Sequence, residues 1–146
     1  MERNDPVRNY LSSVREARMD AKRLRVKVDQ LEARAMSITS QLSGMPRGGG
    51  ADRDAVLASL ADVSRDYYQR LLKAETTELE VLNFIDSLSE ANHRMILKLR
   101  YIDCKRWPRV LSALQAAGVD IEERHMFRLH GEALKAAREK YKEAQS

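Results

Sequence analysis

Apolar side chains recur at alternating spacings of three and four residues through the first third of the chain, from Tyr10 to Met45. The positions are Tyr10, Val14, Ala17, Ala21, Leu24, Val28, Leu31, Ala35, Ile38, Leu42 and Met45. This heptad spacing predicts one long helix with a coiled-coil seam, about 54 Å in length for about 36 residues. A helix cannot bury such a seam by itself. A second helix must therefore cover it.

A turn and a second apolar pattern follow this helix. Pro46 and three consecutive glycines predict a turn over residues 44–52. The positions of the second pattern are Leu57, Leu60, Val63, Tyr67, Leu71, Ala74, Val81, Ile85 and Leu88. We expect residues 1–87 to form a long antiparallel helical hairpin. An intermolecular coiled coil, which would make a homodimer, is the alternative, and both arrangements can hold together.

Residues 88–146 contain three shorter helical patterns, so the chain as a whole is predicted to be all-α. Ser89 is the expected N-cap of a helix that runs to about Asp103. Trp107-Pro108 opens the next helix, because Pro suits a first helical turn. Gly118 is expected to end that helix in the left-handed conformation.

The last helix is expected to follow a capping-box-like pair, Asp120 and Glu123, and to run to about Lys142. Its predicted inward face is Met126, His130, Ala133 and Ala137. A short helix, a turn and a second helix are the parts of a helix-turn-helix DNA reader. In such a reader the second helix enters the major groove. Residues 88–146 are therefore predicted to be a DNA-binding domain.

Eight side chains are candidate contacts to DNA. The candidate contacts to the bases lie on the outward side of the last helix and are Arg124, His125 and Arg128. Arginine can make two hydrogen bonds to guanine. Those for the phosphates are Lys105, Arg106, Arg109, Lys135 and Arg138. The alternative is that all eight are ordinary solvated groups on amphipathic helices, and the spacing of Arg128 and Glu132 would also allow them to pair.

Charge is distributed unevenly along the chain. Residues 51–90 hold nine acidic and four basic residues, whereas residues 91–146 hold seven acidic and twelve basic ones. This favours an anionic partner, such as double-stranded DNA, near the C-terminal part. Cys104 is the only cysteine, which suits a reducing compartment such as the cytoplasm. No apolar run is long enough to span a membrane, so we expect no membrane partner.

The sequence carries no set of residues that indicates catalysis. His125 and His130 are five residues apart, and neither a CxxC nor an HExxH motif is present. The glycines at 48–50 are not followed by the Gly-Lys-Ser/Thr of a phosphate-binding loop. We therefore expect no metal, no cofactor and no enzymatic activity.

Several runs of residues together are typical of a known family. The runs are Ser37–Thr39, Leu42–Gly50, Leu88–Glu90, Leu97–Asp103, Trp107 and Arg124–Leu134. They resemble the phage-encoded ArpU-like transcriptional regulators, which in turn resemble region 4 of bacterial sigma factors, the module that reads promoter DNA. The resemblance extends from Tyr10 to about Tyr141. Sixteen residues lie between Trp107 and Arg124, more than this family has, and the additional residues lie around Gln115–Ile121.

The resemblance implies a small phage or prophage protein that regulates transcription in the cytoplasm of a bacterial host. It places the base contacts at Arg124, His125 and Arg128, and it makes RNA polymerase a candidate partner. The alternative function is a protein-interaction module. Such a module would use the coiled coil to bind RNA polymerase or a phage structural or packaging protein.

Overall fold

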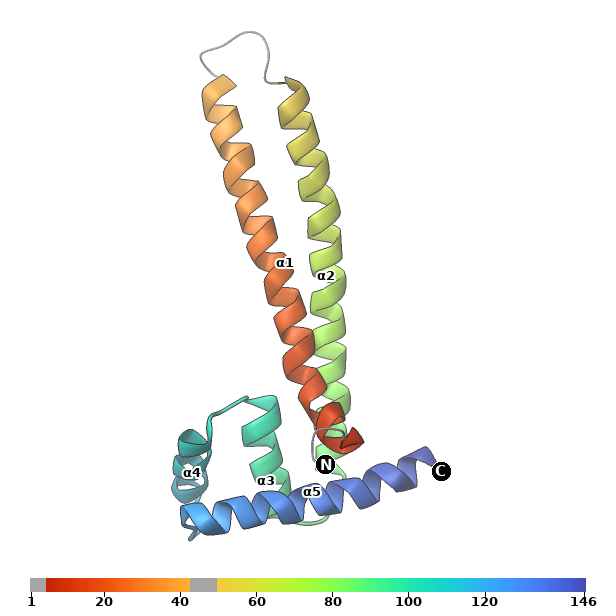
Figure 1. Ribbon diagram of the computed structural model, residues 1–146, viewed down its shortest axis with the longest axis vertical. Helices are drawn as coiled ribbons and strands as arrows, with labels where there is room; N and C mark the ends of the chain where they lie inside the picture. Colours follow the sequence, from red (N-terminus) through yellow and green to blue (C-terminus); the bar gives the residue numbers. More distant parts are fainter. Residues whose placement is uncertain (1–4, 43–49) are drawn as a thin grey trace. The chain divides into compact units, whose positions relative to one another are not determined.

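The computed structural model describes residues 5–42 and 50–146, and this part of the chain is all-helical, as predicted (Figure 1). The elements are α1 (Pro6–Leu42), α2 (Gly50–Asp86), α3 (Ala91–Leu97), the π-helical segment η2 (Lys98–Ile102), α4 (Trp107–Ala116) and α5 (Glu123–Gln145). The predicted turn at 44–52 lies outside the described residues up to position 49, and its last residues belong to α2. No described helix is sufficiently long and apolar to cross a membrane.

Contacts divide the chain into two compact units. Residues 1–16 and 76–146 form one, here called the core unit, and residues 17–75 form the other, here called the two-helix unit. Helices α1 and α2 each contribute one end to each unit. The sequence predicts a domain boundary after residue 87, and this boundary stays a prediction. The contacts group the last residues of α2, from residue 76 onward, with the core unit.

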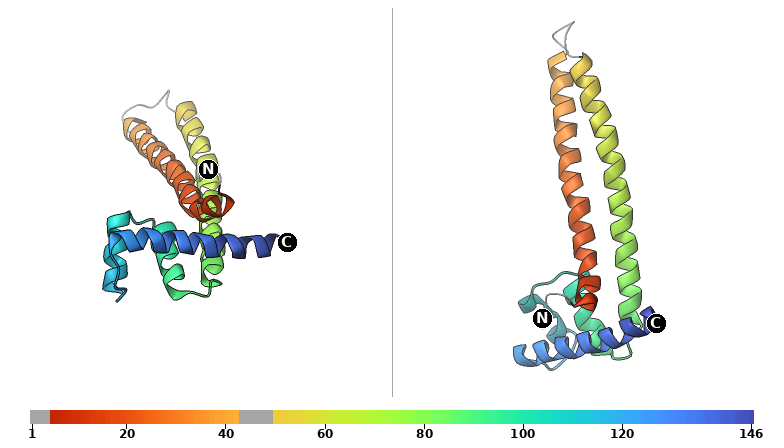
Figure 2. Two further views of the ribbon diagram at one scale, coloured as in Figure 1. Left: turned by 60° about the horizontal axis from the view of Figure 1, so that its bottom comes forward. Right: turned by 45° about the vertical axis from the view of Figure 1, so that its right-hand side comes forward.

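In the two-helix unit, residues 17–42 of α1 and 50–75 of α2 run side by side in opposite directions (Figure 2). The heptad stripe of α1 is its least exposed side, with Ala21 and Val28 buried. Small and β-branched side chains at these positions allow the two helices to approach closely. The local spacing of the sequence is therefore the feature that selects the buried side of α1.

Contacts across this unit fix the alignment of the two helices. The Arg70 guanidinium lies 3.3 Å from the Asp20 carboxylate, and both side chains are half exposed. The prediction that Leu57 belongs to the covered stripe of α2 is wrong, because Leu57 is 41% exposed whereas Val56 is 5% exposed. Both neighbours are apolar, so the sequence pattern alone did not distinguish which one faces α1.

One continuous apolar core holds the core unit together. Its largest fully buried side chains are Leu11, Ile85, Ile96, Leu97, Leu114 and Met126. They come from α1, α2, α3, α4 and α5, so every helix of the chain contributes to this core. Helix α5 packs against α3 (Figure 1). Removal of this apolar surface from water is the main stabilising contribution to the unit.

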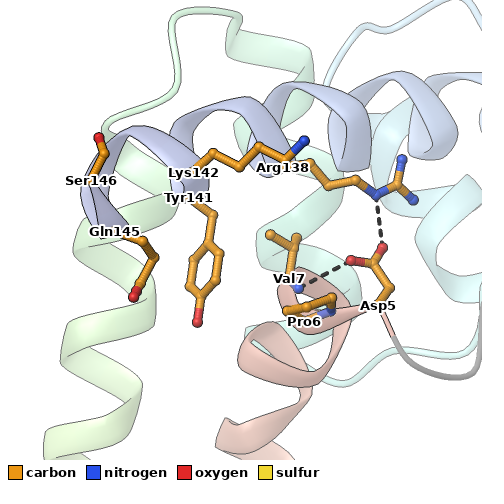
Figure 3. A pocket seen from close by; sticks show the side chains of 8 residues that line it. All are labelled: Asp5, Pro6, Val7, Arg138, Tyr141, Lys142, Gln145 and Ser146. Atoms are coloured by element: carbon orange, nitrogen blue, oxygen red, sulfur yellow. Dashed lines mark hydrogen bonds and ion pairs between the residues drawn. The ribbon is translucent and has the colours of Figure 1, made fainter.

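Asp5 connects the start of α1 to α5. Its Oδ1 accepts a hydrogen bond of 3.1 Å from the Val7 backbone N–H, and its Oδ2 lies 2.9 Å from Arg138 Nε (Figure 3). Asp5 is thus a side-chain N-cap, and Pro6 occupies the first helical position that suits it. A hollow of about 380 Å³ lies beside this contact, with Val7 and Tyr141 in its wall.

The connection between α4 and α5 is a well-defined helix ending. Gly118 has φ of +90°, which confirms the predicted left-handed stop. The Val119 N–H donates to the Leu114 carbonyl and the Gly118 N–H donates to the Gln115 carbonyl, each at 3.0 Å. This pair of bonds is a Schellman motif. The Gln115 side-chain amide also donates to the Ile121 carbonyl at 3.0 Å. Hydrogen bonds therefore hold the connection between α4 and α5 at both of its ends.

The start of α4 at Trp107-Pro108 is confirmed, but both predicted N-caps are wrong. Glu90 rather than Ser89 precedes α3, and no side chain caps that helix. Ser89 lies in the preceding bend, where its carbonyl accepts a 2.9 Å bond from Arg94. Glu122 precedes α5, again without a side-chain cap, which leaves Asp120 outside the helix end. Backbone geometry therefore sets both helix starts.

Candidate nucleic-acid interface

Helix α5 has one apolar face that is buried in the core unit. The predicted inward residues Met126, His130, Ala133 and Ala137 are all buried, and Leu134 joins them. Spacings of four, three and four place these side chains on one side of the helix. The orientation of α5 about its own axis is therefore fixed, and with it the identity of the residues that face solvent.

The opposite face carries four cations and one glycine that we call the basic stripe, formed by Arg124, Arg128, Gly131, Lys135 and Lys142. All five positions are exposed, and their spacings of four, three, four and seven keep them on one side of the helix. No cation of the stripe has an ion-pair partner within residues 5–42 and 50–146. The alternative pairing of Arg128 with Glu132 is thus absent from the described structure.

Gly131 lies in the middle of the basic stripe. Apart from the backbone of its own helix turns and its chain neighbours, a Cβ atom added there would have no atom within 4 Å. Packing against the rest of the protein therefore does not explain the glycine, although glycine inside a helix costs about 1 kcal/mol relative to alanine. The bare backbone at this position is open to a partner.

His125 is exposed but lies beside the basic stripe rather than within it. It shares its side of α5 with Glu132 and Glu139, which are also exposed. The solvent face of the helix is therefore divided lengthwise into a basic and an acidic half. The structure brings Arg124 and Arg128 together on the basic half and places the third predicted base contact at its border.

An aromatic cluster joins the first turn of α4 to the first turns of α5. The Trp107 ring lies 5.2 Å from the Phe127 ring and 4.7 Å from the His130 ring, both edge to face. The Arg100 guanidinium stacks 4.4 Å from the centre of the Trp107 ring. Arg100 also donates to the Lys105 carbonyl at 2.9 Å. The cluster thus fixes the segment that precedes α4 against α5.

This cluster brings most of the predicted phosphate contacts to the same end of the core unit as the predicted base contacts. Lys105, Arg106 and Arg109 flank Trp107 in sequence, while Arg124 and Arg128 flank Phe127. Arg106 and Arg109 are exposed and Lys105 is half buried. None of these three side chains has an ion-pair partner among the described residues. The contact between Trp107 and Phe127 therefore brings the segment that holds Lys105 and Arg106 close to the first turns of α5.

Arg138 differs from the other predicted phosphate contacts because it has a partner within the protein. Its Nε pairs with Asp5, whose side chain is only 11% exposed. This ion pair gives Arg138 a structural role in connecting α5 to α1. Sequence analysis did not identify this contact, although Asp-Pro before an apolar pattern is a recognisable sign of a helix start.

His130 is the only buried polar or charged side chain in the described core. Its Nε2 shares a hydrogen bond of 2.9 Å with the Tyr101 hydroxyl. Burial lowers the pKa of His130 to about 4, and the cationic side chains of Arg8 and Arg100 act in the same direction. The ring is therefore neutral at pH 7 and serves as a packed, hydrogen-bonded group rather than as a DNA contact.

The free energy of unfolding is expected to decrease as the pH falls from about 6.5 to about 4. In the unfolded chain His130 takes up a proton near its ordinary pKa of 6.5, whereas in the folded protein it stays neutral until about pH 4. Protonation in this window therefore favours the unfolded state, by about 2 kcal/mol once partial screening is allowed for. Urea denaturation of the wild type and of His130→Gln across this range checks the effect. An identical pH dependence in both proteins would contradict it.

Among the described residues, no group of three His, Cys, Asp or Glu side chains is placed to hold a metal ion. His125 and His130 point to different sides of α5, one exposed and one buried. No protein-family model, curated protein or solved structure matches the chain. The functional assignment therefore depends on the geometry of the interface described above.

Proposed function

We propose that the core unit is a helix-turn-helix domain that binds double-stranded DNA, with α4 as the supporting helix and α5 as the reading helix. The observation that carries this proposal is the basic stripe, whose cations have no ion-pair partner among the described residues and surround an open glycine. Charged side chains that only face solvent on an amphipathic helix do not require a glycine among them. A helix that lies against a phosphate backbone benefits from it, because removal of the side chain lets the two surfaces come closer.

The roles of the cations follow from their positions. Arg124 and Arg128 lie in the first turns of α5, the part of a reading helix that contacts base edges, and each can bind guanine with two hydrogen bonds. His125 lies at the border of the stripe and would contact an adjacent base. Lys105, Arg106, Arg109 and Lys135 would bind phosphates and so set the position of the helix. We leave Arg138 out of this group because Asp5 binds it.

The lengthened connection between α4 and α5 is compatible with this function. Its residues are fixed by the Schellman motif at Gly118 and by the bond from Gln115 to Ile121. A loose connection would let the reading helix change its angle and blur base recognition. This connection instead presents α5 in one orientation, to which buried Ile121 also contributes.

Within this proposal the protein regulates transcription in a bacterial cytoplasm, as the resemblance to ArpU-like phage regulators and to sigma-factor region 4 suggests. RNA polymerase is a candidate partner, and the predicted hairpin of residues 1–87 would supply the surface that binds it. Neither DNA binding nor binding to RNA polymerase requires a metal, a cofactor or a catalytic group.

The first test of the proposal is selection of bound duplexes from fragmented phage and host DNA, followed by titration of the recovered sequence at several salt concentrations. A protein that neutralises Z phosphates loses affinity with a log–log slope of about −0.9Z, so four contacts predict a slope of about −3.6. Enrichment of one promoter-proximal sequence with such a slope supports the proposal. The absence of duplex binding at low salt would reject it.

Gly131→Ala is expected to affect stability and DNA binding in opposite directions. The folded protein should gain about 0.5–1 kcal/mol, because alanine is the better helix former and the added methyl group meets no protein atom. DNA affinity should fall, because the same methyl group lies where the backbone would approach the duplex. Urea denaturation and DNA titration of this one variant measure both effects. A stabilised variant with unchanged DNA affinity would contradict the idea that the backbone at Gly131 approaches the duplex closely.

A second candidate function is protein interaction through the two-helix unit, and exposed apolar side chains favour it. Tyr68 and Leu72 are each 66% exposed on α2. A contact made by such residues is far less sensitive to salt than a contact to phosphates. The salt titration therefore separates the two functions, which can also coexist in different units of the same chain.

A further inference from the structure

Helix α2 carries a second apolar row, distinct from the side that faces α1 in the two-helix unit. Its members, here called the outer row, are Leu57, Ala61, Tyr68 and Leu72, all exposed. The exposed fractions are 41% for Leu57 and 66% for both Tyr68 and Leu72. Large apolar side chains that share one exposed side of a helix indicate a surface that another molecule covers.

The spacing of the outer row keeps it on one side of a straight helix. Leu57 and Tyr68 are eleven residues apart, and eleven residues are just over three full helical turns. The same interval leads from Tyr68 to Leu79, which is 59% exposed on the same helix. The covered residues Val56, Tyr67 and Ala74 follow a different line. The helix therefore has one apolar side for α1 and another that is exposed.

We propose that the outer row is a self-association surface, on which α2 of a second copy of this chain packs antiparallel. In an antiparallel pair centred on residue 70, Tyr68 of each copy meets Leu72 of the other. The same alignment places Arg65 opposite Glu75 twice, once on each side of the axis. Two apolar contacts and two opposite-charge contacts thus form without any further adjustment, as a symmetric dimer requires.

The charges beside the outer row favour a second copy of the chain as the partner and an antiparallel orientation of the two helices. Arg65 and Glu75 lie ten residues apart on one helix, a rise of about 15 Å, so they cannot pair within a chain. Arg65 has only an exposed contact of 3.6 Å to Asp62, and Glu75 has no ion-pair partner among the described residues. A parallel dimer would set Glu75 against Glu75 and Arg65 against Arg65. Only the antiparallel alignment converts these repulsions into attractions.

The test measures the oligomeric state of the full chain by sedimentation at several protein concentrations. The wild type is expected to form a dimer, and Leu72→Glu is expected to weaken it by at least about 100-fold because two buried apolar contacts are lost. Val26→Glu is the matched control, since Val26 is an exposed apolar residue of α1, and its spacing from the buried Ala21 and Val28 places it on the side of α1 that faces away from α2. It should leave the dimer unchanged. Helix content by circular dichroism should stay constant in both variants, because both positions are exposed.

Charge reversal separates this alignment from other ways to dimerise. Arg65→Glu and Glu75→Arg are each expected to weaken the dimer about tenfold or more, because each creates two like-charge contacts. The double variant that carries both changes should recover wild-type association. A monomeric wild type, a dimer that tolerates Leu72→Glu, or a double variant no better than the single ones would each overturn the proposal. None of these results depends on DNA binding.

Discussion

Replacement of both Arg124 and Arg128 by alanine is expected to weaken binding to the selected DNA sequence by about 2–5 kcal/mol. Each bidentate arginine–guanine contact contributes about 1–3 kcal/mol of discrimination. Both side chains are exposed, and neither has an ion-pair partner among the described residues, so their loss should leave the fold intact. The measurement is a titration of matched specific and unrelated duplexes. The specific duplex should lose between about 30-fold and several thousand-fold in affinity.

Lys140→Ala is the matched control for this variant, because Lys140 is an exposed cation of α5 outside the basic stripe. It removes one positive charge and should change the affinity for the specific duplex only slightly. A phosphate-contact variant such as Arg106→Gln should weaken both duplexes to a similar degree and reduce the salt slope by about one. If the double arginine variant instead loses affinity equally for both duplexes, the two arginines bind phosphates and do not read bases.

Leu114→Ala is expected to reduce the free energy of unfolding by about 2–5 kcal/mol. Leu114 is fully buried in the apolar core, and its carbonyl accepts the bond that closes the helix ending at Gly118. Truncation of a buried leucine removes apolar contacts and leaves a cavity that the neighbours fill only in part. The backbone bond itself survives, so the loss measures packing.

Urea denaturation followed by circular dichroism measures this loss, with Leu111→Ala as the control from the same helix. Leu111 is only half buried, and its truncation should therefore cost much less. Equal losses in the two variants would mean that the core around Leu114 collapses to fill the cavity. The supporting helix would then contribute less to the position of α5 than the structure indicates.

The inward face of α5 and the ends of α4 could be predicted because local chemistry sets them. Periodicity identified Met126, His130 and the two alanines, and Trp107-Pro108 and Gly118 marked a helix start and stop. Each of these signals depends on residues within a few positions of one another. The exposure of Arg124 and Arg128 then followed directly, because a buried face determines the face opposite to it.

The remaining features depend on contacts between residues far apart in sequence. Nothing in the local pattern shows that Asp5 binds Arg138, or that Arg100 stacks on Trp107. Likewise, adjacent apolar residues such as Val56 and Leu57 satisfy the same periodicity to within one position, and only the partner helix decides between them. The predicted caps at Ser89 and Asp120 fail for a related reason, because the backbone path sets each helix start at another residue.

The ion pair between Asp5 and Arg138 joins residues separated by 133 positions, and this separation affects the order in which the chain folds. During synthesis all residues of the two-helix unit are present once residue 75 has emerged. Its two helices follow one another directly in the sequence, so they can pair at that stage. The core unit needs both its earliest and its latest residues, so it cannot assemble until α5 is present. Contacts of such long range are slow to form. We therefore expect the paired long helices to form first, and the proposed DNA-reading surface to appear only after α5 has emerged.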